Sequence, residues 1–323
     1  MCTSPIIPDE PVGKIVMACD NPVETDLKQT IAGIQLGYGI PSFLLMLIMF
    51  VHLAKSKKYK NSFYRLVQVD LVVNMSCWLN TWIGLRALDH EAGVNFVKWL
   101  ENRVNGTFGV SQFFIYFFFH MQFSSAAILS VHRFSSIKFF TKYERFWSKY
   151  YPLVTLLLII YSSLPQIGGP PVTMEIRNDT IFITTDVEKY IFNAGELFLF
   201  AIIYFIALVA LGITVARSAF KALQETSSGN QEVSRKLTKI ALTYALVYSG
   251  LLLWTILNMS IIALQFLPVL VLETLMTMLG LASDMMTLSL PYILLIFDTN
   301  IKRDFRISKE TANVVPAVAS FSL

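Results

Sequence analysis

Seven long apolar segments constrain this chain more than any other feature of its sequence. A helix needs about 20 predominantly apolar residues to cross the hydrocarbon core of a bilayer. Only 15% of the 323 residues are charged, against about 25% in a typical soluble domain. The pattern predicts an all-α bundle of seven transmembrane helices over residues 31–297, with an N-terminal tail (1–30) and a C-terminal tail (298–323). The predicted spans are residues 31–54, 63–85, 107–131, 151–167, 190–216, 240–264 and 268–297.

The basic residues predict the orientation of these helices. Nineteen of the 26 Lys and Arg residues follow the first, third, fifth and seventh segments, six lie on the other side, and Arg86 caps the second segment. Since basic residues accumulate on the cytoplasmic side of a membrane, the N-terminal tail is predicted to be extracellular and the C-terminal tail cytoplasmic, as expected in a plasma membrane. The net charge of +4 therefore reflects topology, and no nucleic-acid partner is expected.

The predicted extracellular regions carry further signals. Asn105 and Asn178 stand in glycosylation sequons, and alternating residues within the loop 168–189 predict a short hairpin. Cys2 and Cys19 both lie in the N-terminal tail and either pair or stay free. No signal-peptide pattern precedes the first apolar segment, which is expected to act as an uncleaved signal-anchor.

Motifs for catalysis and metal binding are absent from the sequence. It contains no HExxH, no GxSxG and no glycine-rich phosphate loop. Its four histidines lack the spacing of metal ligands. We therefore expect neither an enzyme nor a bound metal or cofactor.

Two acidic residues within the apolar segments indicate an intramembrane site. Charged residues at membrane depth are costly and often functional, so Asp70 and Asp284 are candidates for a polar network. Asn74, one helical turn from Asp70, is the expected partner of Asp284. The alternative is that each acid only fixes helix packing.

His132 and Arg133 close the third segment at its predicted cytoplasmic end. Arg133 either switches between intramembrane partners and a cytoplasmic protein, or extends to the membrane surface as an ordinary basic residue. A pocket for a small molecule is expected among the outer helix halves, since apolar walls with a few polar groups are typical of such sites. Its candidate residues are Trp82, Gln112, Tyr116, Asn193, Glu196, Trp254, Asn258, Glu273 and Thr277.

Several motifs, in order along the chain, are similar to those of one receptor family. They are Tyr-Gly-Ile-Pro-Ser at 38–42, Phe-Tyr-Arg-Leu at 63–66, Leu-Asn-Thr-Trp at 79–82, Lys-Tyr-Glu-Arg-Phe-Trp at 142–147 and Pro-Tyr-Ile-Leu at 291–294. With these motifs the chain resembles the nematode serpentine receptor class gamma chemoreceptors over nearly its whole length.

The resemblance implies a G-protein-coupled receptor for odorants or pheromones in the ciliary membrane of sensory neurons. Arg133 would then match the arginine that ends the third helix of this architecture, and Lys236 and Lys239 would lie near the G protein. His132 departs from the usual polar or acidic residue before that arginine. A transporter of a small solute is the alternative, although no inverted repeat is detectable, and homo- or hetero-oligomers remain open.

Overall fold

The computed structural model describes most of the chain. The described residues are 14–19, 26–87, 91–139, 142–164, 172–177, 180–225, 243, 246–250, 252–253, 256, 269–298 and 300–305.

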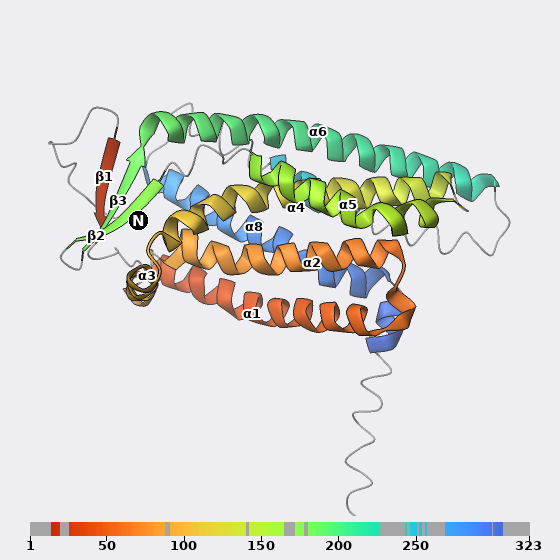
Figure 1. Ribbon diagram of the computed structural model, residues 1–323, viewed down its shortest axis with the longest axis horizontal. Coiled ribbons are helices and arrows are strands. Elements are labelled where there is room, and N and C mark those ends of the chain that lie inside the picture. Colours follow the sequence, from red (N-terminus) through yellow and green to blue (C-terminus); the bar gives the residue numbers. More distant parts are fainter. Residues whose placement is uncertain are drawn as a thin grey trace, which may run out of the picture.

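Six long helices run side by side along one axis (Figure 1). Each coincides with one predicted span, and the described residues between 243 and 256 are also helical, within the predicted sixth span. The six are α1 (Asp26–Lys55), α2 (Ser62–Thr81), α4 (Thr107–Lys138), α5 (Tyr143–Ser163), α6 (Val187–Glu225) and α8 (Val269–Phe297).

The helices have the length and surface of membrane-spanning elements. Three stretches among the described residues are long and apolar enough to cross a bilayer: Thr30–Lys55, Thr107–Lys138 and Gly195–Ser218. Ser283–Phe297 is a shorter apolar helix. Large apolar side chains such as Leu157 on α5 are more than half exposed. Extensive exposed apolar surface of this kind marks contact with lipid.

A three-stranded antiparallel sheet covers one end of the bundle, which we call the sheet end (Figure 1). Strands β2 (Val172–Arg177) and β3 (Thr180–Asp186) form the hairpin predicted for residues 168–189. Strand β1 (Lys14–Cys19), from the N-terminal tail, adds to the other side of β3 and places Cys19 opposite Ile181. This pairing was not predicted.

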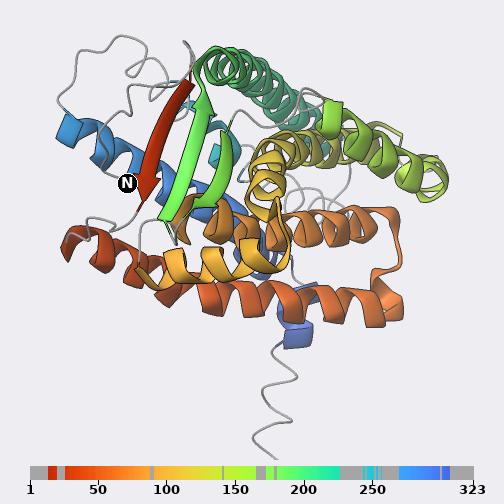
Figure 2. The same ribbon diagram turned by 60° about the vertical axis from the view of Figure 1, so that its left-hand side comes forward.

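A further helix, α3 (Glu91–Arg103), lies across the sheet end (Figure 2). Its buried residues Val94 and Val97 pack with Ile181 and other residues of the sheet, whereas Phe96 and Trp99 are about half exposed. The opposite end, here called the tail end, carries the short 3-10 helix η1 (Lys57–Tyr59) and the helical residues 300–305.

Glu101 joins α3 to the start of α4. Its carboxylate accepts hydrogen bonds from the backbone N–H groups of Gly106 (2.5 Å) and Phe108 (3.0 Å). Gly106 takes the left-handed conformation with φ 86°, which glycine adopts without strain. Because the first N–H groups of a helix lack intrahelical partners, the buried Glu101 acts as a cap supplied from a neighbouring helix.

We expect Glu101→Ala to lower the free energy of unfolding by about 1 kcal/mol, since lost helix caps cost about 0.5–2 kcal/mol. The measurement is the thermal midpoint of the purified full chain in detergent. Glu188→Ala is the control, because Glu188 is an exposed acid in the first turn of α6. Equal midpoints for the two variants would contradict the capping role.

Candidate functional site

A π-helical turn at the end of α2 directs Arg86 into the bundle. Residues Trp82–Arg86 form this turn, named η2, and the N–H of Ala87 bonds to the carbonyl of Trp82. Such turns are rare and occur frequently at functional sites. Gly84 lies so close to α4 that a Cβ atom there would stand 2.6 Å from Ser111 Oγ. The absence of a side chain therefore lets the turn pack against α4, and Arg86 is only 9% exposed.

Arg86 forms a buried ion pair with Asp284 of α8. Its Nη2 lies 2.7 Å from Asp284 Oδ1, and the hydroxyl of Tyr38 on α1 donates to Oδ2 at 2.9 Å. The pair thus joins three helices in the half of the bundle near the sheet. A buried charge in a membrane protein requires a partner and by default indicates a functional site.

Three hydrogen-bond donors around this pair have no partner among the described residues. Arg86 Nη1, Trp82 Nε1 and Trp78 Nε1 are buried and unbonded. The Arg86 guanidinium also lies 5.0 Å from the ring centre of Trp82. Buried donors are normally satisfied, and each exception calls for an explanation. The arrangement can accept a molecule that offers hydrogen-bond acceptors to Arg86 and Trp82.

The hydrogen bonds of Asn74 among the described residues go to Asp70 and Gln122 rather than to Asp284. Asn74 Nδ2 donates to Asp70 (3.3 Å), while Asn74 Oδ1 accepts from Gln122 of α4 (2.7 Å). Gln122 also donates to Thr287 of α8 at 3.2 Å. The physical reason is that Arg86 and Tyr38 already satisfy the Asp284 carboxylate, while Asp70 and Gln122 bond to the Asn74 side chain.

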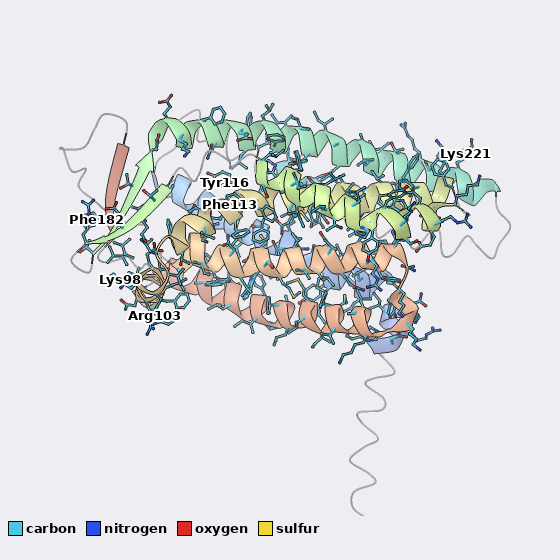
Figure 3. All side chains as sticks on the ribbon, viewed as in Figure 1. Lys98, Arg103, Phe113, Tyr116, Phe182 and Lys221 are labelled. Atoms are coloured by element: carbon cyan, nitrogen blue, oxygen red, sulfur yellow. The ribbon has the colours of Figure 1, made fainter. Side chains whose placement is uncertain are left out.

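The remaining pocket candidates that the structure describes lie on α4 and α6. Gln112 donates to the carbonyl of Gly84 (2.8 Å) and so helps to hold η2 against α4. Tyr116 is buried on α4, one turn beyond Gln112 (Figure 3). On α6, Asn193 is buried and Glu196 half-buried, and no described contact joins them to Arg86. Trp254 and Asn258 lie outside the described residues, as do the side chains of Glu273 and Thr277.

His132 is held inside the bundle at the tail end. It is 1% exposed, and its Nε2 lies 2.9 Å from Ser62 Oγ of α2. Ser62 Oγ donates to Glu144 of α5 at 2.7 Å, so it accepts a hydrogen bond from His132 Nε2. This contact requires a proton on His132 Nε2. His132 therefore ties α4 to α2 and α5 in this state.

Arg133 is buried rather than extended to the membrane surface. Its Cζ lies 3.2 Å from the ring centre of Phe63, and the residue is 6% exposed. Nε and Nη2 have no hydrogen-bond partner among the described residues. Stacking on an aromatic ring stabilises a cation by about 0.5–2 kcal/mol, which is less than a charge-assisted hydrogen bond network provides. Phe63 thus covers Arg133, while two of its nitrogens lack acceptors among the described residues. This position is inconsistent with the alternative in which Arg133 extends to the membrane surface.

Asp298 and Asp304, which follow α8, attach the C-terminal end of this helix to η1 and to the start of α2. Tyr64 donates to Asp298 (2.6 Å), and Tyr59 donates to Asp304 (2.7 Å). Lys58 adds an ion pair with Asp304 at 3.0 Å. The Tyr59 hydrogen bond lowers the pKa of Asp304 below its ordinary value, with further help from Lys58. Sequence reasoning missed this cluster because its members lie about 245 residues apart.

The other predicted sites are only partly described. Asn105 is exposed in the turn between α3 and α4, whereas Asn178 lies outside the described residues. Lys236 and Lys239 also lie outside them. Cys77 is a buried free thiol.

The bundle of long apolar helices and its buried polar groups define a helical membrane protein. The sequence model of the Srg family chemoreceptors matches residues 32–305. Serpentine receptor class gamma-47 of Caenorhabditis elegans is 34% identical over 276 residues, covering 84% of this chain and 89% of the relative. Serpentine receptor class gamma-53 of the same organism is 32% identical over 272 residues, covering 83% and 88%.

The chain belongs to the Srg family of chemoreceptors. The resemblance inferred from the motifs is confirmed, and so are the all-α seven-transmembrane fold class and the location in a membrane.

Proposed function

We propose that this chemoreceptor binds a small odorant or pheromone between α1, η2, α4 and α8 and signals through a heterotrimeric G protein at the tail end. One observation carries the proposal for the ligand site. A buried ion pair between Arg86 and Asp284 is surrounded by donors that lack acceptors, namely Arg86 Nη1 and Trp82 Nε1. A ligand with an acceptor group would complete these hydrogen bonds.

The proposed orientation has the sheet end outside the cell and the tail end in the cytoplasm. Basic residues gather at the tail end, such as Lys57 and Lys58 after α1, Lys138 in the last turn of α4 and Lys302 after α8. This distribution supports the orientation by the positive-inside rule. Glycosylation at Asn105 and Asn178 and a plasma-membrane, ciliary location are proposed with it.

Coupling to the G protein is proposed to depend on Arg133. In the structure Phe63 covers the guanidinium, and His132 holds α4 against α2. A ligand changes the balance between two receptor states only through its different affinities for them. In the signalling state Arg133 would leave Phe63 and, with Lys236 and Lys239, contact the G protein. Membership of a chemoreceptor family favours this receptor function over a transporter.

Substitution of Trp82 by phenylalanine tests the ligand site, because it removes the indole N–H and keeps an aromatic ring. We expect the concentration for half-maximal response to rise about two- to tenfold, as one neutral hydrogen bond contributes about 0.5–1.5 kcal/mol. The measurement is nucleotide exchange by a G protein reconstituted with the full chain, using an active compound from a chemical library. Trp99→Phe is the control, since Trp99 is 55% exposed on α3. Equal responses of both variants would contradict the site.

A further inference from the structure

A groove on the outside of the bundle forms a cavity that is separate from the proposed ligand site. It lies between α2, α4 and α5, has a volume of about 530 Å³ and does not include Arg86 or Asp284. Its walls are mainly apolar, with Val72 and Val73 on α2 and Phe114 and Phe117 on α4. Val72 is 42% exposed and Phe114 is 36% exposed, so the groove opens toward lipid and not toward the bundle interior.

Two polar residues of α2 line the groove near the tail end. Gln68 is 8% exposed, yet its carboxamide Nε2 is buried and has no hydrogen-bond partner in the part of the chain that the structure describes. Arg65 is half-buried, and its guanidinium forms no described hydrogen bond or ion pair. Residues three apart on a helix share a face and differ by about 4.5 Å in height. The groove therefore presents a cation near the end of the span and an amide donor one turn deeper.

A cation near the membrane surface, an amide donor below it and apolar walls below that match the order of phosphate, ester and acyl chain in a phospholipid of one leaflet. A phosphate is the natural partner of an arginine side chain, and the ester carbonyls of a phospholipid lie just below its phosphate. The residues of α2 that line the groove run from Arg65 to Ser76, a length of about 16 Å at about 1.5 Å per residue. The apolar walls of the groove are suited to one acyl chain.

We propose that this groove binds a bilayer phospholipid. The phosphate contacts Arg65, an ester carbonyl accepts a hydrogen bond from Gln68, and one acyl chain lies along Val72, Val73 and Phe117. The negative charge of the phosphate complements Arg65, which distinguishes the proposed lipid from a sterol or diacylglycerol. Because the groove connects α2, α4 and α5, a bound lipid would hold these helices together independently of the ligand at the sheet end.

Photocrosslinking of the full chain in phosphatidylcholine vesicles tests the proposal. The probe is a phosphatidylserine that carries a photoreactive group on its acyl chain, and the crosslinked peptides are mapped by mass spectrometry. We expect crosslinks to the segments that contain Val72 and Phe117, and their loss in Val72→Trp, which fills the groove. Leu79→Trp is the matched control, because Leu79 is also lipid-facing on α2 (50% exposed) and does not line the groove.

The contact with the phosphate is tested with Arg65→Leu and Gln68→Leu. Each is expected to weaken crosslinking about two- to tenfold, since one hydrogen bond contributes about 0.5–1.5 kcal/mol, with the larger effect at Arg65. Arg145→Leu, at an exposed position on α5 near the same end, should have no effect. Equal crosslinking of wild type, Val72→Trp and Leu79→Trp would overturn the groove as the site. A photoreactive diacylglycerol or sterol that labels the groove as strongly as phosphatidylserine would overturn the assignment to a phospholipid.

Discussion

Asp284→Ala should lower the free energy of unfolding by about 3–5 kcal/mol, because breaking a buried ion pair leaves the other charge uncompensated. The remaining charge would be Arg86, which is only 9% exposed. At about 2–4 °C per kcal/mol for a chain of this size, the thermal midpoint in detergent should fall on the order of 10 °C.

A triple variant separates the unpaired charge from the lost packing. This variant combines Tyr38→Phe, Arg86→Met and Asp284→Leu, so that no buried charge or unpaired hydroxyl remains at the site. Replacing a buried ion pair by apolar residues often leaves the free energy of unfolding nearly unchanged. We expect the triple variant to regain most of the lost stability. As a control, removal of the exposed pair Glu175–Arg177 should change stability by less than about 1 kcal/mol. A triple variant as unstable as Asp284→Ala would refute the electrostatic explanation.

Arg133→Ala should reduce ligand-stimulated nucleotide exchange by about tenfold or more, because a charge-assisted contact contributes about 1.5–3 kcal/mol. Conversely, Phe63→Leu should raise the exchange rate without ligand by about twofold or more, since it removes the ring that covers Arg133. Both effects follow from one equilibrium between a covered and an uncovered Arg133.

Lys138→Ala is the matched control for Arg133→Ala. Lys138 is a cation at the same end of α4, lies 5.6 Å from the rings of Phe134 and Phe139, and is exposed. Its removal should leave exchange close to the wild-type rate at equal surface expression. Full signalling by Arg133→Ala, with unchanged expression, would disprove the proposed role of Arg133.

The helices and the hairpin were predictable because their signals are local. Each described long helix coincides with an apolar segment of the sequence, and the alternation within 168–189 predicts paired β2 and β3. Helix α3 was missed because it has only 13 residues and is amphipathic, so it lacks the signal of a span. Strand β1 was missed because its partner β3 lies far away in the sequence.

The polar pairs were only partly predictable, because they depend on how the helices approach each other. The sequence indicated Asp70, Asn74 and Asp284 as buried polar residues, and all three are almost fully buried. It did not indicate that Arg86 turns inward, since this follows from the π-helical turn and the close contact at Gly84. Arginine at the end of a span is usually interpreted as an anchor at the membrane surface, so no local signal identifies it as the partner of Asp284.

The most direct test of the account is the accessibility of epitope tags at the two ends of the chain. In the proposed receptor, the ligand enters from the sheet end outside the cell and the G protein contacts the tail end inside it. In intact cells, antibodies should therefore label a tag at the N-terminus, and should label a tag at the C-terminus only after permeabilisation. Labelling of both tags, or of the C-terminal tag alone, in intact cells would contradict the proposed receptor.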